Sequence, residues 1–324
     1  MVNFTIVIPT YNRTHLIKRS VDSALANIIE GDEILIIDDG SKEDYSEVLK
    51  DYDPLTVKYN KIQNGGVSAA RNYGLDIAKN DFIAFLDDDD EWYENHLGSH
   101  RSVYESRPDL AGVFCNFNNT TKSGEMLPNG IAIWSDGMPQ IQELLKLETI
   151  NNMPDSADVY IGEHYKNQLS TDYILPSSFT FNRNVCGSND RFYLGLNRNQ
   201  TWLFNSHICS YGPVAFIDNI TCVQHGDAEI RNTGVGYFET LMSRLFVMPR
   251  EWGSNINFYR QNKKLYDDTR FQDFFCAFKI AIRQLSITKI FRLVKLVGAL
   301  VFLRYSFRSI YYFLRPGKVK LRTT

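Results

Sequence analysis

Three short apolar runs in the first 90 residues end in clusters of polar residues, and this feature strongly limits the possible folds. The runs cover residues 4–8, 33–37 and 82–86, and each has the length and composition of a buried strand. Helical patterns lie between them, over residues 16–26 and 67–78. This alternation predicts an α/β fold, with a doubly wound, mostly parallel sheet and helices on both faces. Ligands of such sheets bind outside the carboxyl ends of the strands, where the polar clusters fall.

Four consecutive aspartates, Asp87 to Asp90, follow the third apolar run. Their negative charges repel one another, so the folded protein must gain something by holding them together. Carboxylate oxygens are preferred ligands of Mg²⁺ and Mn²⁺, and these ions fill their remaining positions with the phosphates of a ligand. The sequence therefore predicts a divalent metal ion at this turn. The alternative is a solvated acidic loop.

Four motifs occur in a fixed order between residues 7 and 90. They read VIPTYNR at 7–13, IDDGS at 37–41, NGGVSAARN at 64–72 and FLDDDD at 85–90. Together they resemble the family-2 inverting glycosyltransferases of GT-A fold, of the type that assembles bacterial surface polysaccharides. The resemblance is strong over residues 3–118, becomes thinner up to about residue 226 and stops there.

The resemblance implies a role for individual residues of these motifs. Tyr11 would stack on the base of a bound nucleotide, Asp39 would accept a hydrogen bond from that base, and Arg71 would lie beside the nucleotide. Asp87 would reach the ribose or the metal, and Asp89 would hold the metal on the diphosphate. The implied cofactor is Mn²⁺ or Mg²⁺, and the implied donor-binding residues are Pro9, Thr10, Tyr11, Asp39, Arg71, Asp87 and Asp88. The alternatives to these roles are a capped turn at Tyr11, helix capping by Asp39 and a surface ion pair of Arg71.

The general base of the reaction is not evident from the sequence. The family usually has an Asp before the Trp of the segment that corresponds to residues 198–202, and this chain has Thr201 there. A threonine cannot serve as a base near neutral pH, so three explanations are open. Another acid such as Asp190 is the base, the base comes from a different loop, or the chain binds donors without efficient transfer. His225 resembles a late histidine of the family that approaches the metal or diphosphate, with a structural histidine as the alternative; the other histidines show no metal-ligand spacing.

Charge is unevenly divided along the 324 residues. Residues 270–324 hold twelve of the 35 Lys and Arg residues and one of the 38 acids, so this segment carries +11 and the rest −14. Apolar residues crowd the same segment, and its bases recur near helical spacing. The pattern predicts basic amphipathic helices on an anionic membrane surface, and residues 296–303, the longest uncharged run, are too few to span a bilayer. The alternative is a tail packed on its own catalytic domain or on a second subunit; nucleic-acid binding is not expected of so apolar a segment.

These patterns together predict the domain organisation. Residues 1–226 would form the GT-A-like domain, with a nucleotide-sugar half (1–118) and an acceptor half (119–226). Residues 227–269 would connect it to the basic helical tail, 270–324. Five scattered cysteines fit a reducing compartment, and the sequence begins without the layout of a secretory signal. We therefore expect a cytoplasmic protein, peripheral on the inner face of the cell membrane.

The predicted function is that of an inverting, metal-dependent glycosyltransferase. It would move a sugar from a nucleotide-sugar, by resemblance a UDP-sugar, to a hydroxyl of a saccharide acceptor, which can be lipid-linked. The alternative is a catalytically weak or silent sugar-nucleotide-binding scaffold protein, which Thr201 suggests. A nucleotidyltransferase is disfavoured, because residues 9–12 occupy the place of its glycine-rich phosphate loop. A homo-oligomer is left open.

Overall fold

The structure is a computed structural model that describes residues 1–134, 145–150, 152–154, 156–196, 198–227 and 236–313, with only the backbone of residues 310–313. The chain divides into two compact units. The first contains residues 1–195 and 204–229, and the second contains residues 196–203 and 230–324. The predicted start of the tail, residue 270, falls within helix α11 (Ile256–Arg283) of the second unit. The end of the predicted tail, 314–324, lies outside the described residues.

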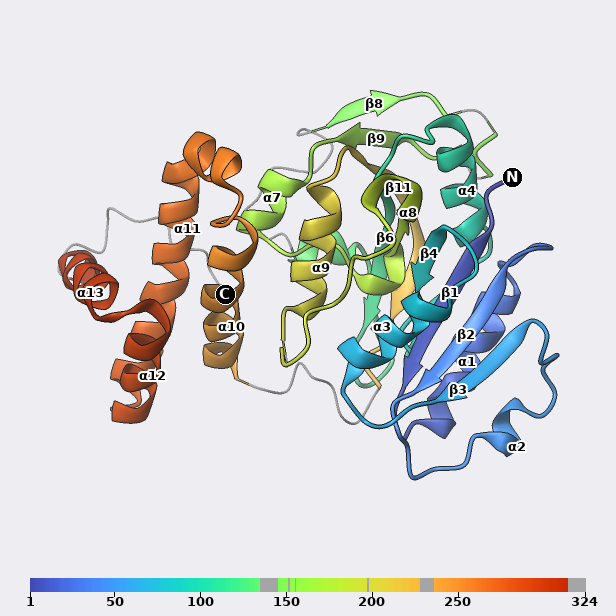
Figure 1. Ribbon diagram of the computed structural model, residues 1–324, viewed down its shortest axis with the longest axis horizontal. Coiled ribbons are helices and arrows are strands. Elements are labelled where there is room, and N and C mark those ends of the chain that lie inside the picture. Colours follow the sequence, from blue (N-terminus) through green and yellow to red (C-terminus); the bar gives the residue numbers. More distant parts are fainter. Residues whose placement is uncertain (135–144, 151, 155, 197, 228–235, 314–324) are drawn as a thin grey trace. The chain divides into compact units, whose positions relative to one another are not determined.

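Among the described residues of the first unit, eleven strands form one sheet, in the order β3-β2-β1-β4-β10-β6-β11-β9-β8, with β5 on β11 and β7 on β6 (Figure 1). Strand β10 is antiparallel to both of its neighbours, so β6 and β11 run in the same direction as β1 to β4. The sheet is therefore mostly parallel, and the predicted fold class is confirmed. The strands are β1 (Phe4–Thr10), β2 (Glu33–Asp38), β3 (Val57–Lys61), β4 (Phe82–Phe85), β5 (Asp90–Trp92), β6 (Gly112–Thr120), β7 (Met126–Leu127), β8 (Lys146–Glu148), β9 (Val159–Gly162), β10 (Phe179–Asn182) and β11 (Val214–Gln224).

Helices cover both faces of this sheet. Successive side chains of a strand point to opposite faces. Val7 of β1 lies beside Phe85 of β4, and a side chain at Gly74 of α3 would overlap Val7, so α3 covers their face. Phe4 points the other way and packs on Tyr104 of α4. The helices of this unit and its 3-10 turn are α1 (Thr14–Leu25), α2 (Ser46–Leu49), α3 (Val67–Ile77), α4 (His96–Ser106), α5 (Gly130–Trp134), α7 (Tyr165–Ser170), η1 (Pro176–Ser178), α8 (Arg183–Cys186) and α9 (Gln200–Cys209), whose first residues belong to the second unit.

The second unit is helical over its described residues. Besides α11, it contains α10 (Tyr237–Glu251), α12 (Ile287–Val297) and α13 (Ala299–Phe313), drawn in orange to red in Figure 1. Apolar side chains from all four helices form its core, including Phe238, Leu245, Phe274, Phe278, Leu293 and Tyr305. None of the described helices is long and apolar enough to cross a membrane.

Local sequence explains the bounds of α12. Its first turn is capped by Ser286, whose hydroxyl accepts a hydrogen bond from the Lys289 amide. The helix ends at Gly298, which has a φ of +83°, a conformation that side chains disfavour and glycine adopts freely. The next helix begins directly afterwards, so the two helices are joined by a sharp turn.

Candidate active site

The polar clusters that follow three neighbouring strands lie at one edge of the sheet. Strands β2, β1 and β4 are parallel neighbours, so their carboxyl ends are adjacent. The Asp39 amide donates to the Thr10 carbonyl at 2.9 Å, and Thr10 Oγ1 donates to Asp88 Oδ2 at 2.6 Å. Pro9 is buried in β1, while Tyr11, just beyond the strand, is 45% exposed and presents its ring to solvent. The structure thus brings these residues together at the edge where ligands of such sheets bind.

Asp88 is the buried anchor of the acidic turn, residues 87–90. Its carboxylate accepts hydrogen bonds from Thr10 Oγ1 and Arg13 Nη1, both at 2.6 Å. The same Arg13 nitrogen lies 3.2 Å from Asp89 Oδ2. Burial raises the pKa of Asp88 to about 6, and the positive charge of Arg13 opposes this rise. Asp88 therefore ties the turn to the end of β1.

Two buried serines hold the backbone of the acidic turn. Ser177 Oγ accepts a hydrogen bond from the Asp87 amide at 3.1 Å and donates to Asp90 Oδ2 at 2.6 Å. Ser20 Oγ, from α1, lies 3.1 Å from the Asp87 carbonyl and 2.8 Å from the Asp90 carbonyl. Because Ser177 belongs to η1, the turn is fixed from two distant parts of the chain. This support limits the positions that the acidic side chains can adopt.

Asp87 and Asp89 are the acids of the turn that are nearest to solvent. Their side chains are 28% and 13% exposed, whereas Asp90 is almost fully buried. Carboxylate oxygens of these three acids lie within 4.8 Å of one another. Oxygen ligands of this kind fit a hard cation such as Mg²⁺ or Mn²⁺. Since Asp90 is bonded to Ser177, Asp87 and Asp89 are best placed to hold such an ion.

Arg71 balances the charge of Asp87. Its Nη2 lies 2.5 Å from Asp87 Oδ1. The guanidinium group also packs against the rings of Phe85 and Phe192, at 5.8 and 5.2 Å from their centroids. The side chain leaves the second turn of α3, so its position is set by the packing of that helix on the sheet. Arginine in this place can pair with a carboxylate and also with a phosphate.

Asp39 organises the loop that leads into α3. Its carboxylate accepts hydrogen bonds from the amides of Gly65 and Gly66, each at 2.8 Å, and from the Asn64 side chain at 3.1 Å. Gly40 has a φ of +77°, and a side chain there would approach the Asn64 backbone nitrogen to 2.8 Å, so the turn requires glycine. A carboxylate can accept about four hydrogen bonds. Asp39 thus shapes the loop and retains capacity for one more donor.

A second charged group joins the acidic turn from the end of β11. His225 Nε2 lies 2.9 Å from Glu91 Oε2, so the late histidine is bonded to β5, the strand that leaves the turn. Arg19 donates to the Asp89 carbonyl at 2.6 Å and pairs with Asp227 at 2.9 Å. The hydrogen bond from Arg19 to the Asp227 carboxylate lowers the pKa of Asp227. Asp227 was not predicted from the sequence. The only sequence feature that could have indicated it is its position two residues after His225.

Asp190, the candidate general base, has partners of its own. Its Oδ1 accepts a hydrogen bond from the Tyr211 hydroxyl at 2.8 Å and lies 3.2 Å from His207 Nε2. Two residues further on, Phe192 packs against Arg71. Asp190 therefore belongs to the segment that supports the arginine of the site. Thr201 lies in the first turn of α9.

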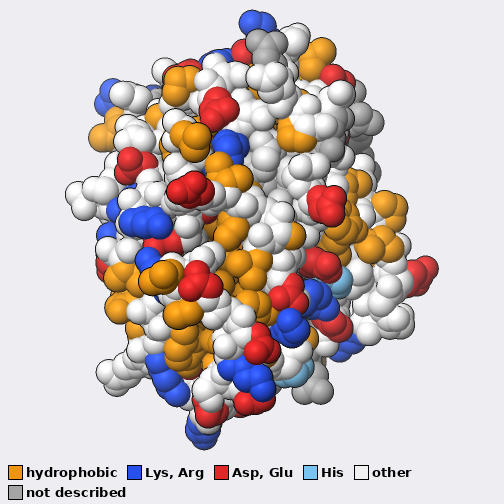
Figure 2. Space-filling model, turned by 90° about the vertical axis from the view of Figure 1, so that its right-hand side faces the viewer, with side chains coloured by type: hydrophobic (Ala, Val, Ile, Leu, Met, Phe, Trp, Pro, Cys, Tyr) orange, Lys and Arg blue, Asp and Glu red, His pale blue; other side chains and the backbone are white. Residues whose placement is uncertain are grey.

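An apolar depression lies beside β3 and is distinct from the acidic turn. Figure 2 views the molecule from the side of β2 and β3 and shows apolar side chains gathered between charged ones. The depression is lined by residues of β2, β3, α2, α3 and the segment before β3, namely Leu35, Leu49, Tyr52, Pro54, Val57, Lys58, Tyr59, Asn60 and Ile77. None of these described lining residues carries a carboxylate, so the chemistry of the depression differs from that of the acidic edge.

A family profile matches a segment of the chain that includes the acidic edge. The profile described as Glycosyl transferase family 2 matches residues 5–162, from β1 to the end of β9. Residues 5–162 belong to glycosyl transferase family 2. The resemblance found in the four motifs is thereby confirmed. This family 2 domain contains Thr10, Asp39, Arg71 and the whole acidic turn.

Part of the chain is also similar to bacterial proteins. The "Minor teichoic acid biosynthesis protein GgaA" of Bacillus subtilis is 38% identical over 110 residues, which are 32% of this chain and 24% of that protein. An "Uncharacterized glycosyltransferase" of Rickettsia bellii is 30% identical over 165 residues, 47% of this chain and 24% of its own length. The matches thus span about a quarter of the length of these curated relatives.

Solved structures support the fold. TarS 1–349 of S. aureus in complex with UDP-GlcNAc has a TM-score of 0.63 at 14% identity, over 94% of this chain and 81% of that chain. GalNAc-T7 with UDP, GalNAc and Mn²⁺ has a TM-score of 0.53 at 16% identity, over 80% of this chain and 50% of that chain. These likenesses confirm the GT-A-like fold with its C-terminal helical region.

Proposed function

We propose that the protein transfers a sugar from a nucleotide-sugar donor to a hydroxyl group of a saccharide acceptor. The observation that carries this proposal is the pair Asp87 and Asp89 at the carboxyl edge of a family 2 glycosyl transferase domain, beside Arg71 and Arg13. Breaking the bond between sugar and diphosphate builds negative charge on the leaving group, which cations at this edge would stabilise. The UDP-GlcNAc bound to TarS favours a UDP-sugar.

Asp87 and Asp89 would hold Mn²⁺ or Mg²⁺ together with the donor diphosphate. When bound, the ion would neutralise the charge of the departing nucleoside diphosphate. The Mn²⁺ in the GalNAc-T7 structure favours this assignment. Asp88 and Asp90 would act by keeping the turn in shape, since their carboxylates are already bonded to protein groups. His225 would support the same region through Glu91.

Other residues of the edge would position the donor. Tyr11 is exposed and would stack on the base, while Asp39 would use its remaining hydrogen-bond capacity on that base. Arg71 would exchange part of its pairing with Asp87 for a phosphate oxygen of the donor. A guanidinium suits this exchange because its several donors can serve two anions at once.

The transfer itself would be a single displacement with inversion. The acceptor oxygen forms a bond to the anomeric carbon, the bond from this carbon to the diphosphate breaks, and the acceptor proton passes to a general base. Asp190 is our candidate for this base. Its Oδ2 is buried and lacks a hydrogen-bond partner among the described residues, so this oxygen is able to accept a proton. Asp190→Asn should then abolish transfer while donor hydrolysis persists; unchanged transfer would exclude Asp190.

A silent donor-binding protein is the second candidate function. It is favoured by Thr201, because the family usually has an acid at that place. Such a protein would bind the same donor and metal through the acidic edge. It would differ in showing no turnover with any acceptor.

We also propose that the second unit contacts an anionic membrane surface, where a lipid-linked acceptor would be within reach. Its helices carry strongly exposed apolar side chains, with Phe291 at 68% and Phe307 at 71% exposure. Basic residues such as Arg283, Lys295 and Arg304 are exposed on the same helices. Exposed apolar and basic side chains together are typical of helices that lie at a membrane surface. The name of the relative GgaA, a minor teichoic acid biosynthesis protein, supports a part in polysaccharide assembly, and we propose the cytoplasmic face of the cell membrane as its place.

The deciding experiment measures hydrolysis of a panel of sugar nucleotides with and without Mn²⁺. We expect slow hydrolysis of one donor that is lost with chelator and in Asp89→Asn. Asp109→Asn is the matched control, since Asp109 is an exposed, ion-paired acid just before the amino end of β6, at the opposite edge of the sheet. Metal-dependent binding of a donor without hydrolysis or transfer would favour the silent binder. If the protein neither binds nor hydrolyses any donor, this result contradicts both proposed functions.

A further inference from the structure

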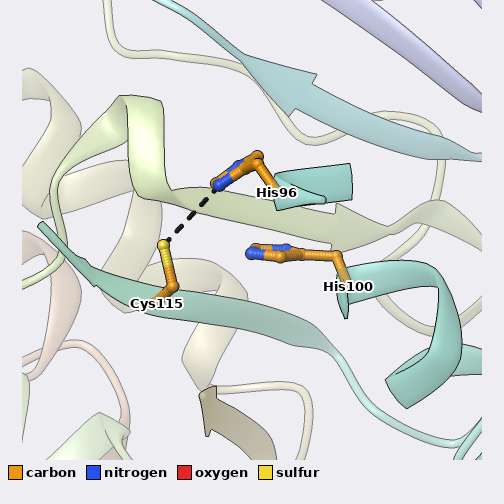
Figure 3. A group of neighbouring side chains, drawn as sticks. All are labelled: His96, His100 and Cys115. Atoms are coloured by element: carbon orange, nitrogen blue, oxygen red, sulfur yellow. Dashed lines mark hydrogen bonds between the residues drawn. The ribbon is translucent and has the colours of Figure 1, made fainter. Parts of the chain in front are cut away.

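A buried group of two histidines and a cysteine lies in the first unit, apart from the acidic turn (Figure 3). His96 and His100 are four residues apart in α4 and share one face of that helix, so the expectation that no histidine besides His225 has metal-ligand spacing was wrong. Cys115 comes from β6. All three side chains are fully buried, and one ligand atom from each lies within 4.8 Å of the other two. Figure 3 shows both rings extending from α4 toward the side on which the Cys115 thiol lies.

The contacts within the group leave part of its bonding capacity unused. His96 Nδ1 lies 2.9 Å from Thr221 Oγ1 and 3.7 Å from Cys115 Sγ, and Thr221 Oγ1 is 3.1 Å from the same sulfur. His100 Nδ1 lies 2.9 Å from Thr180 Oγ1. The Nε2 atoms of both histidines have no hydrogen-bond partner within the described part of the chain. Buried polar atoms without a partner are unfavourable, so His100 Nε2 is poised to accept a ligand, while His96 would offer Nδ1, the nitrogen that faces Cys115 and Thr221.

The protonation states in this interior suit a metal. Burial lowers the pKa of His100 to about 3 and also lowers that of His96, so both rings are neutral. Neutral imidazole is the form that binds metal ions, and a bound ion converts a thiol to its thiolate, which overcomes the raised pKa of Cys115. The indole of Trp92 stacks on His96 with 4.5 Å between the ring centroids. The site is therefore closed, as a structural metal site is expected to be.

We propose that His96, His100 and Cys115 bind a structural Zn²⁺ ion, with the Thr221 hydroxyl as fourth ligand. Zn²⁺ takes imidazole and thiolate ligands at about 2.0–2.3 Å in a tetrahedron, which places neighbouring ligand atoms roughly 3.3–3.8 Å apart. The observed 3.7 Å between Cys115 Sγ and His96 Nδ1 agrees with this spacing. Thr221 Oγ1 is at hydrogen-bond distance from both atoms, 2.9 and 3.1 Å, and would move slightly away from them to bind the ion. The contact of His100 Nδ1 with Thr180 would orient the ring, as outer partners of metal-bound histidines do.

Such an ion would join three elements that surround the acidic edge. Helix α4 supplies both histidines, β6 supplies the thiol and β11 supplies Thr221. Strand β11 also pairs with β5, which begins at Asp90 of the acidic turn. The ion would therefore brace the frame of the site, and its presence does not depend on the proposed transferase activity.

The test measures zinc in the full-length protein, purified after growth with added zinc and dialysed against EDTA to strip the exposed acidic turn. We expect about one zinc ion per chain in the wild type and in Asp89→Asn, and at least a tenfold loss in Cys115→Ala and His100→Gln. Cys222→Ala is the matched control, because Cys222 is another fully buried thiol on β11 that is not among the proposed ligands. It should retain zinc.

A measurement on the wild type alone guards against variants that fail to fold. Refolding with Co²⁺ should produce the thiolate-to-cobalt charge-transfer absorption that oxygen ligands do not give. Absence of both zinc and this absorption in the wild type would overturn the proposal. Zinc that is lost in Asp89→Asn and retained in Cys115→Ala would place the ion at the acidic turn and overturn it as well. Copper in place of zinc would overturn the identity of the metal.

Discussion

Replacing Ser177 with alanine should weaken the metal-dependent use of the donor, although Ser177 itself is not expected to touch the metal. Its hydroxyl donates to the Asp90 carboxylate at 2.6 Å and accepts from the Asp87 amide at 3.1 Å. The residue is fully buried, and alanine fits the same space, so the change removes two hydrogen bonds without adding bulk. Asp87 keeps its side chain and loses an anchor of its backbone.

The size of the effect follows from these two bonds. A hydrogen bond to a charged group contributes about 1.5–3 kcal/mol, and one to a neutral amide about 0.5–1.5 kcal/mol. The free energy of unfolding should therefore fall by about 2–4 kcal/mol. If about 1.4 kcal/mol of this is lost specifically from the metal-bound state, half-maximal donor hydrolysis requires about ten times more Mn²⁺.

The assay is a Mn²⁺ titration of donor hydrolysis, accompanied by urea unfolding of the same samples. Ser178→Ala is a close control, since Ser178 is equally buried in the same 3-10 turn and its hydroxyl donates to the Leu175 carbonyl at 3.0 Å. We expect Ser178→Ala to lose stability and keep its Mn²⁺ requirement. An equal shift of the requirement in both variants would show a general effect of destabilisation. An unchanged requirement in Ser177→Ala would refute the positioning role.

Three further predictions concern other parts of the structure. Arg71→Lys should raise the KM for the donor about tenfold, because lysine retains the charge but loses the planar guanidinium on Phe85 and Phe192. The control is Arg191→Lys, at an exposed ion pair with Asp76, which should leave this KM unchanged. Equal KM values for the two variants in steady-state kinetics would contradict the role of Arg71. Burial lowers the pKa of His164 to about 3. Below pH 6.5 the unfolded chain therefore gains a proton at His164 that the folded protein does not bind, and lowering the pH from 7 to 5 should remove about 2 kcal/mol of unfolding free energy. Urea unfolding of His164→Asn should lack this share of the loss, exposed His15→Asn should retain it, and identical pH dependence in both variants would refute the assignment. Phe291→Glu combined with Phe307→Glu should reduce flotation with anionic liposomes, while Leu55→Glu, at an exposed apolar residue of the first unit, should not; flotation equal to that of the wild type would exclude these side chains as membrane contacts.

The sequence predicts the frame of the acidic edge because that frame depends on local patterns. An apolar run such as residues 82–86 carries its own strand signal, and the polar residues after it must emerge at the end of the strand. The structure places β4 at Phe82–Phe85, directly before the acids. In contrast, Ser177 and Ser20 reach the acidic turn from remote positions, and no local pattern marks such contacts. Cys115 joins His96 and His100 for the same reason, since only the sheet order brings β6 beside α4.

The helical unit shows a different limit of sequence reasoning. Its basic, apolar composition indicates amphipathic helices from residue 270, and the structure has helices there. The segment 227–269, expected to be a connection, contains α10 and the first half of α11 among its described residues. Phe238 and Leu241 of α10 enter the same core as Phe274 of α11. A truncation near residue 268 would therefore cut a packed helix, and point substitutions of exposed side chains test membrane contact more cleanly.

The four acids of the turn illustrate why composition alone cannot assign chemistry. In the sequence they are equivalent, and the expected roles of Asp87 and Asp89 come from their resemblance to a family motif. In the structure, Asp88 and Asp90 are buried and bonded to Thr10, Arg13 and Ser177, while Asp87 and Asp89 keep contact with solvent. A fully buried carboxylate gives up its hydrogen bonds to bind a cation, whereas Asp87 and Asp89, although each also pairs with an arginine, can exchange part of their hydration for the ion. Burial and hydrogen bonding thus select the alternate pair as the metal-binding candidates, and they do so without any appeal to the family.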